Sequence, residues 1–197
     1  QKQKHILAYD ALTSYHDQGI ITSMDSRTRA YIKIQEGCNR FCSYCLIPFA
    51  RGQVRSRDPQ EIVLEAETLL AHGFRELVLT GINTALYGTE EAFAYPLTAA
   101  EQAAGMHGIE IIISRLNALD GDFRIRLSSL EPTVVNADYV KRLLQYEKLC
   151  PHLHLSIQSG SDAVLQAMHR HYSRADYLDI VRVLKAHDPH YGITTDI

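Results

Sequence analysis

The chain has 197 residues, of which 46% are hydrophobic and 22% are charged, as expected for one large or two small globular domains. This composition excludes a disordered or collagen-like chain, and no apolar run approaches the roughly 20 residues that a transmembrane helix needs. The net charge of −3 gives no sign of a nucleic-acid partner, and four cysteines are too few for a secreted disulfide scaffold.

The first half of the chain predicts two strands and two helices. Residues 30–36 alternate apolar and polar side chains, which is typical of a strand, and a cysteine-containing loop follows to about residue 57. Asp58 and Pro59 begin a helix that Gly73 ends, since proline is favoured at the first helical position. Residues 76–80 form a short apolar strand, 84–97 a loop, and 98–118 a long helix.

The second half repeats this alternation. We expect strands at 123–127, at 152–158 and from 192 to the end, with helices at 136–146, 161–169 and 173–187. Strands that alternate with helices pair in parallel through right-handed crossovers. No glycine-rich dinucleotide fingerprint follows any strand, so the pattern predicts a partial (βα) barrel rather than a Rossmann fold. The fifth strand is cut short by the end of the sequence.

Chemistry in such barrels lies at the carboxyl ends of the strands. Polar or reactive residues follow four of the predicted strands there. They are the cysteines after the first, Gly81 to Asn83 after the second, Ser128 to Glu131 after the third, and Gln158 to Ser161 after the fourth.

The cysteines Cys38, Cys42 and Cys45 have the spacing C-x3-C-x2-C, which points to a metal centre in a reducing compartment. Three thiolates on a four-iron cluster leave one iron open to a substrate. Zinc completed by a distant histidine is the alternative. Cys150 precedes the fourth strand, at the opposite end from this loop, so we expect it to be a buried apolar residue.

With Tyr44 before the last cysteine, this motif resembles the radical S-adenosylmethionine (radical SAM) superfamily. Residues 34–38 (Ile-Gln-Glu-Gly-Cys), 45–52 (Cys-Leu-Ile-Pro-Phe-Ala-Arg-Gly), 55–57, 79–83, 87–88 and 152–161 further resemble its methylthiotransferases, over about residues 21–197. Residues 126–132 (Arg-Leu-Ser-Ser-Leu-Glu-Pro) and 79–88 look most like the branch that modifies N6-threonylcarbamoyladenosine beside the tRNA anticodon. The assignment to this branch depends mainly on Glu131.

The resemblance implies a cytoplasmic enzyme that adds a methylthio group to carbon 2 of that base. It implies a [4Fe-4S] cluster on the three cysteines, S-adenosylmethionine on the open iron, and a one-electron reductant such as flavodoxin or ferredoxin. A second, auxiliary cluster belongs to an N-terminal domain. We therefore expect residues 1–29 to be a linker from that domain and residues 30–197 to be a radical SAM core, incomplete at its C-terminus.

Two other readings remain open. One is a methylthiotransferase of another branch, acting on isopentenyladenosine in tRNA or on a ribosomal protein. The other is a non-catalytic iron–sulfur or zinc domain that binds RNA.

The resemblance also suggests cofactor contacts, each beside a structural alternative. Tyr44 either packs over the cluster and the adenine of the cofactor or is a core aromatic residue. Gly81 and Asn83 hold the methionine end of the cofactor, although Gly81 could simply form a turn. Ser129 and Glu131 bind ribose or substrate or merely end a strand. Gln158 and Ser159 contact the cofactor ribose, and Arg170 is a weaker candidate for the cofactor carboxylate because most arginines at such positions are solvated.

A basic zone surrounds the cysteine loop, although the whole chain is acidic. Residues 27–57 contain seven lysines and arginines and only one acidic residue, Glu36. We expect its arginines to rim the mouth of the barrel, where some of them contact the phosphates of tRNA; the alternative is a solvated loop with scattered charge. These arginines are Arg27, Arg29, Arg51, Arg55 and Arg57.

Overall fold

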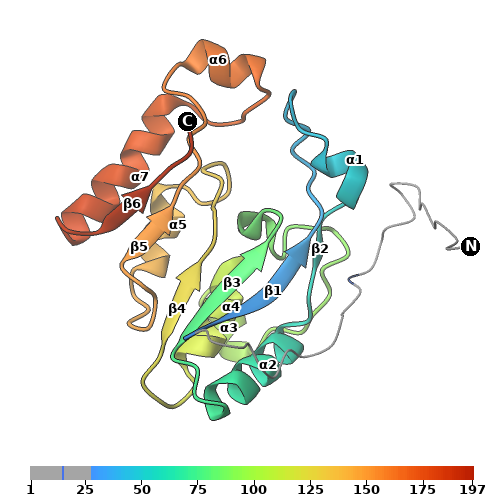
Figure 1. The fold of residues 1–197 in the computed structure, drawn as a ribbon, viewed down its shortest axis with the longest axis vertical. Helices are drawn as coiled ribbons and strands as arrows, with labels where there is room; N and C mark the ends of the chain where they lie inside the picture. The colour runs from blue at the N-terminus through green and yellow to red at the C-terminus, as the bar shows by residue number, and fades with distance from the viewer. Residues whose placement is uncertain (1–14, 16–27) are drawn as a thin grey trace, which may run out of the picture.

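In the computed structural model, Tyr15 and residues 28–197 are described. Three parallel strands, β1 (Arg29–Glu36), β3 (Glu76–Gly81) and β4 (Arg124–Leu127), form the centre of one sheet (Figure 1). The two-residue strand β2 (Arg55–Ser56) pairs antiparallel with β1, which gives the order β2-β1-β3-β4. A second parallel pair consists of β5 (His152–His154) and β6 (Gly192–Thr194).

The two sheets form one curved wall. Isolated bridges join Ile125 to Leu149 and Leu130 to Leu155, so the chain around β5 continues the sheet beyond β4. The result is a half-barrel of mainly parallel strands with helices outside, which confirms the predicted partial (βα) barrel.

Helices cover the outer face of this wall. The longer ones are α2 (Pro59–Ala71), α4 (Ile109–Asn117), α5 (Ala137–Leu143) and α7 (Arg174–His187). The alternate residues Ala30, Ile32 and Ile34 of β1 are fully buried and belong to the same core as Ile62 and Leu69 of α2. The period-two pattern that predicted β1 therefore arises because one face of the strand packs on helices.

The start of α2 follows the predicted signal. Asp58 caps the helix by accepting a hydrogen bond of 2.7 Å from the Gln60 amide, and Pro59 occupies the first turn. Within the described residues, no helix is both long enough and apolar enough to cross a lipid bilayer.

One predicted helix is wrong. The expected helix at 98–118 is two helices, α3 (Ala99–Ala103) and α4, because Gly105 and Gly108 both have φ of +60°. A right-handed helix cannot continue through the left-handed backbone region, which glycine adopts readily.

Other boundaries are shorter than predicted. The strand expected at 152–158 ends at His154, and the helix expected at 136–146 ends at Leu143. The short helices α1 (Ile47–Arg51) and α6 (Asp162–Ala167), the 3-10 turn η2 (Thr84–Leu86) and strand β2 complete the structure. Both α1 and β2 are too short to show a hydrophobic period in the sequence.

Candidate functional site

The cysteine loop leaves the end of β1 and is closed at its base. Gly37 has φ of +72°, and a Cβ there would lie 1.7 Å from the Gln53 carbonyl oxygen, so only glycine fits. The Cys38 amide donates a hydrogen bond of 3.1 Å to the Gly52 carbonyl, which joins the two ends of the loop. Helix α1 lies within this loop and ends directly before Gly52.

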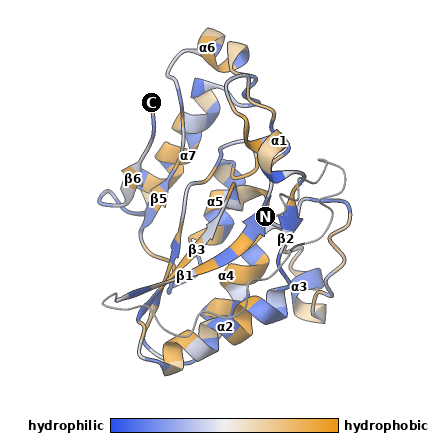
Figure 2. Cartoon of the chain, turned by 45° about the vertical axis from the view of Figure 1, so that its right-hand side comes forward, coloured by the Kyte–Doolittle hydropathy of each residue, from blue (hydrophilic) through white to orange (hydrophobic). Residues whose placement is uncertain are grey.

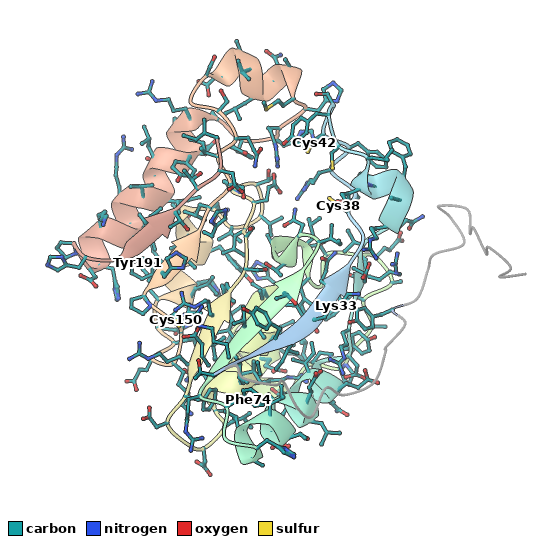
Figure 3. The ribbon with its side chains drawn as sticks, viewed as in Figure 1. Lys33, Cys38, Cys42, Phe74, Cys150 and Tyr191 are labelled. Atoms are coloured by element: carbon teal, nitrogen blue, oxygen red, sulfur yellow. The ribbon has the colours of Figure 1, made fainter. Side chains whose placement is uncertain are left out.

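The three cysteines of the motif line one cavity of about 160 Å³, and none of them forms a disulfide. Cys38 and Cys42 are buried and Cys45 is half-buried. Burial raises the pKa of the Cys38 and Cys42 thiols, and the nearby charge of Arg170 opposes this rise at Cys42. Figure 3 shows Cys38 and Cys42 beyond the carboxyl end of β1, whereas Cys150 lies beside the start of β5. Cys150 is buried, as expected.

The opposite wall of the same cavity comes from the ends of three other strands. Ile82 and Asn83 follow β3, Ser129 to Glu131 follow β4, and Ser156 and Gln158 follow β5. Arg170, after α6, completes the lining together with Arg40 and Ile47 of the cysteine region. The structure therefore brings five of the predicted cofactor residues to the cysteines, namely Asn83, Ser129, Glu131, Gln158 and Arg170.

Gly81 and Ser159 are not among the residues that line the cavity. A Cβ on Gly81 would lie 2.9 Å from the Gln35 side-chain oxygen, so the absence of a side chain lets β3 approach β1 closely. The Ser159 hydroxyl accepts a hydrogen bond of 3.2 Å from the Ser161 amide, which stabilises the turn before α6. Any contact of these two residues with a cofactor remains a prediction.

Asn83 is held by a residue that sequence reasoning missed. The Gln35 side-chain oxygen accepts a hydrogen bond of 3.0 Å from the Asn83 amide, and its Nε2 donates to the Glu36 and Gly37 carbonyls. This fixes the end of β3 against the start of the cysteine loop. The buried Oδ1 of Asn83 has no hydrogen-bond partner within the described residues, and such an atom in a cavity wall points to a missing ligand.

Glu131 also has a partner that the sequence did not reveal. Arg40, inside the cysteine motif, lies with its Nε 3.1 Å from Glu131 Oε2, and the Thr133 hydroxyl donates to the other oxygen. Glu131 is buried, so the Arg40 cation compensates its charge. This ion pair ties the cysteine loop to the end of β4 across the cavity.

Arg170 is half-buried, so the expectation that an arginine at this position is solvated is wrong. Its Nη2 donates to the Tyr44 hydroxyl at 2.7 Å, and that hydroxyl donates to Gln158 Oε1 at 3.1 Å. Its guanidinium also lies 5.9 Å from the centre of the Tyr172 ring. Tyr44 is exposed and is not among the residues that line the cavity, so its packing over a cluster or an adenine remains a prediction.

The expected rim of arginines is wrong in three places. The Arg57 side chain is only 2% exposed and pairs with buried Glu65 and with Glu61. Arg55 is buried and donates to the Arg51 and Gln53 carbonyls at 3.0 and 2.8 Å. Arg29 begins β1 at the far end from the cysteines and pairs with Glu76 at 2.9 Å.

Arg51, at the end of α1, is 56% exposed and stays a candidate for RNA contact. Arg27 lies outside the described residues.

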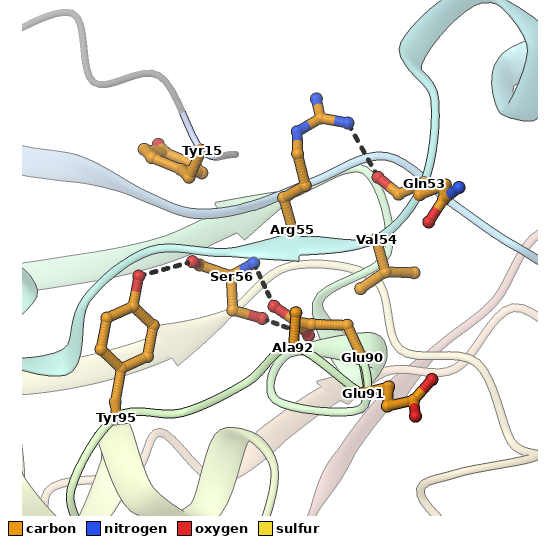
Figure 4. Close-up of a pocket in the computed structure, with 9 residues that line it drawn as sticks. All are labelled: Tyr15, Gln53, Val54, Arg55, Ser56, Glu90, Glu91, Ala92 and Tyr95. Carbon is orange, nitrogen blue, oxygen red and sulfur yellow. Dashed lines mark hydrogen bonds between the residues drawn. The ribbon is translucent and has the colours of Figure 1, made fainter. Parts of the chain in front are cut away.

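A larger cavity, of about 540 Å³, lies at the β2 edge and contains no cysteine. Glu90 accepts hydrogen bonds from the Ser56 amide and hydroxyl at 2.6 and 2.9 Å, and the Tyr95 hydroxyl donates to the Ser56 carbonyl at 3.4 Å (Figure 4). These groups cap the edge of the sheet, which is a structural role.

The residues around the smaller cavity fit an iron–sulfur cluster. Among the described residues, no three His, Cys, Asp or Glu side chains are placed to hold a single metal ion. In a four-iron cluster each cysteine binds a different iron, so the thiols need to border one cavity without converging on a point. Three soft thiols and an unpartnered Asn83 oxygen therefore suit a cluster with a polar ligand beside it.

Comparisons with known proteins agree with this geometry. The sequence pattern of the radical SAM superfamily matches residues 32–196. A threonylcarbamoyladenosine tRNA methylthiotransferase of Chlamydia pneumoniae is 37% identical over 177 residues, which are 90% of this chain and 38% of that protein. A tRNA-2-methylthio-N(6)-dimethylallyladenosine synthase of Caldicellulosiruptor saccharolyticus is also 37% identical, over 91% of this chain and 36% of that protein. The chain thus spans little more than a third of the length of these relatives.

Solved structures resemble the fold at lower identity. The cobalamin-dependent S-adenosylmethionine radical enzyme OxsB superposes with a TM-score of 0.60 at 13% identity, over 84% of this chain and 23% of that one. The radical S-adenosylmethionine methyltransferase TsrM of Kitasatospora setae gives 0.58 at 19% identity, over 84% and 27% of the two chains. With its cysteine loop at the end of β1 in a half-barrel, the chain belongs to the radical SAM superfamily.

Proposed function

We propose that this chain is the radical SAM core of a cytoplasmic tRNA methylthiotransferase that acts on carbon 2 of N6-threonylcarbamoyladenosine beside the anticodon. The observation that carries the proposal is the cavity in which three free thiols face polar residues from the ends of β3, β4 and β5. Identity of 37% with methylthiotransferases over about nine-tenths of the chain supports the reaction class.

In this proposal Cys38, Cys42 and Cys45 hold a [4Fe-4S] cluster as thiolates. With S-adenosylmethionine bound, the reduced cluster supplies the radical chemistry that activates the substrate carbon. The chain's own residues position and shield the cofactor. Asn83 offers its unpartnered oxygen to the ammonium group of the cofactor, and Arg170 and Gln158 border the cavity from the opposite side. Ile47, Ile82 and Leu130 supply apolar walls that exclude water.

The choice of base rests on Glu131. Relatives of both base specificities have the same identity to this chain, so overall similarity does not select one. Glu131 lines the cavity and is paired with Arg40, so its carboxylate is fixed where a substrate enters. We further propose that the residues before β1, expected as a linker over 1–29, link this core to a preceding domain that carries the auxiliary cluster; Arg29 itself belongs to β1.

Two assays test this proposal. The chain alone, reconstituted without oxygen and reduced by dithionite, should cleave S-adenosylmethionine to 5′-deoxyadenosine without methylthiolating tRNA, because it holds only one cysteine triad. Methylthiolated nucleoside from the chain alone would contradict the need for a second cluster. Absence of cofactor cleavage by an iron-loaded chain would contradict the radical SAM core itself.

A chimera tests the choice of base. This chain replaces the matching segment of the tRNA-2-methylthio-N(6)-dimethylallyladenosine synthase of Clostridium novyi, which is 37% identical over 184 residues. We expect the chimera to gain methylthiolation of N6-threonylcarbamoyladenosine, detected by nucleoside mass spectrometry, and Cys42→Ala in the same chimera to abolish it. If the chimera modifies only dimethylallyladenosine, the residues that select the base lie outside the segment supplied by this chain.

A further inference from the structure

Exposed apolar side chains gather beside the cysteine cavity. Eight large hydrophobic side chains of the described residues are exposed, and half of them lie between positions 41 and 49. We call these four, Phe41, Tyr44, Leu46 and Phe49, the loop patch. Leu46 and Phe49 are 73% and 66% exposed, and Figure 2 shows hydrophobic colouring on α1 at the margin of the molecule. Such a concentration of exposed apolar side chains within the cysteine loop marks a contact surface.

The rings of the loop patch are held in place. Phe41 and Phe49 meet edge to face with ring centres 5.6 Å apart. Phe41 has φ of +47°, a left-handed conformation that bulky residues rarely adopt. The Tyr44 hydroxyl is fixed by Arg170 and Gln158. The patch therefore offers preformed aromatic faces and edges rather than mobile side chains.

The surroundings of the loop patch are basic. Residues 37–57 contain four arginines, of which Arg51 is exposed and lies 3.9 Å from Glu36, whereas the other three are paired with carboxylates elsewhere in the fold. Residues 163–175 contain two arginines and two histidines and again no acidic residue, and the Ser43 amide donates to the Met168 carbonyl at 3.1 Å. Glu36, which ends β1, and Glu131, which lines the cysteine cavity, are buried and paired with cations. Asp162 and Asp176 lie at the two ends of residues 163–175. Exposed Arg51 lies two residues from Phe49.

We propose that the loop patch is the surface on which unpaired bases of the substrate RNA stack, with Arg51 on a neighbouring phosphate. The inference rests on the proposed function and adds the place where RNA is held. RNA supplies both flat apolar faces and negative charge, and aromatic rings with arginines are the combination that binds single-stranded nucleic acid. A purely apolar protein partner would use the rings but not the exposed guanidinium of Arg51.

The test measures binding of a synthetic anticodon stem–loop RNA carrying N6-threonylcarbamoyladenosine, by fluorescence anisotropy, to the full chain with its cluster reconstituted. We expect Phe49→Ala and Phe41→Ala each to weaken binding about tenfold, because one lost base–ring stack has roughly that effect. Phe49→Tyr should bind like the wild type, and Phe49→Leu should bind like Phe49→Ala. Iron analysis of each variant checks that the loop still holds its cluster.

A matched control comes from an exposed apolar residue elsewhere. Leu64 on α2 is 54% exposed, and Leu64→Ala should leave RNA affinity unchanged. Wild-type binding with no loss in the Phe49 variants would overturn the loop patch while leaving the proposed function intact. A wild-type chain that does not bind this RNA would contradict the proposed function as well. If Phe49→Leu keeps full affinity, or if sedimentation shows that Phe49→Ala converts a dimer to a monomer, the patch buries apolar surface instead of stacking bases.

Discussion

Two cavities within the described residues, one at the β2 edge and one at the cysteines, differ in the polar groups that line them. The larger one, at the β2 edge, is lined by groups that bond to one another, such as Glu90 with Ser56 and Tyr95 with Ser56. The smaller one holds three free thiols and the unpartnered oxygen of Asn83. Three free thiols beside an unpartnered buried oxygen, rather than volume, therefore mark the smaller cavity as the site where a ligand is expected.

The largest effect is expected when the three thiols, which distinguish the smaller cavity from the larger one, are removed. Replacing Cys38, Cys42 and Cys45 together by alanine should reduce bound iron and sulfide to background and abolish S-adenosylmethionine cleavage, because alanine supplies no thiolate. Chemical assays of iron and sulfide after anaerobic reconstitution provide the measurement. Cys150→Ala should keep the iron content of the wild type, since Cys150 lies at the other end of the sheet. A triple variant that still binds wild-type iron would refute the assignment.

The second prediction concerns the arginines that were expected at the rim of the barrel but are buried in the structure. Arg57→Met leaves the buried carboxylate of Glu65 without its main partner, which should lower the free energy of unfolding by about 3–5 kcal/mol in denaturant titrations. The double variant Arg57→Met, Glu65→Met should recover most of that loss. Glu61→Gln, which removes the exposed partner, should change stability by about 1 kcal/mol or less. Equal stability of wild type and Arg57→Met would show that this pair does not support the fold.

These arginines show where sequence reasoning ends. The cysteine spacing, the alternation of strands and helices, and the rule that parallel strands share a carboxyl edge placed Asn83, Ser129, Glu131 and Gln158 correctly at one cavity. The partners of those residues were not predictable, because Gln35 with Asn83 and Arg40 with Glu131 meet only through the fold. Arg57 looked like a phosphate ligand for the same reason, since its partner Glu65 comes from α2.

The third prediction compares the loss of one polar side chain from each cavity, Asn83 in the smaller and Glu90 in the larger. Asn83→Ala should weaken S-adenosylmethionine binding about tenfold or more while leaving iron content unchanged, because a hydrogen bond to a charged group is lost. Equilibrium dialysis with the reconstituted chain measures this. Glu90→Gln, in the larger cavity, serves as the control and should leave cofactor affinity unaltered. A normal affinity in Asn83→Ala would mean that its buried oxygen faces a water molecule instead of the cofactor.

The smallest effect belongs to Arg51, the arginine that remains exposed near the cysteine loop. A phosphate contact carries no sequence information, so Arg51→Gln should lower RNA affinity for all sequences alike. It should also reduce the slope of log affinity against log salt by about 0.7–0.9, the contribution of one released counterion. Arg182→Gln on α7 is the matched control, because Arg182 is 70% exposed and pairs with Asp179 on its own helix. If both variants keep the wild-type slope, phosphate binding lies elsewhere in the protein. If only Arg51→Gln loses it, the charge beside the loop patch acts on RNA, whereas Arg55 and Arg57 act on the fold.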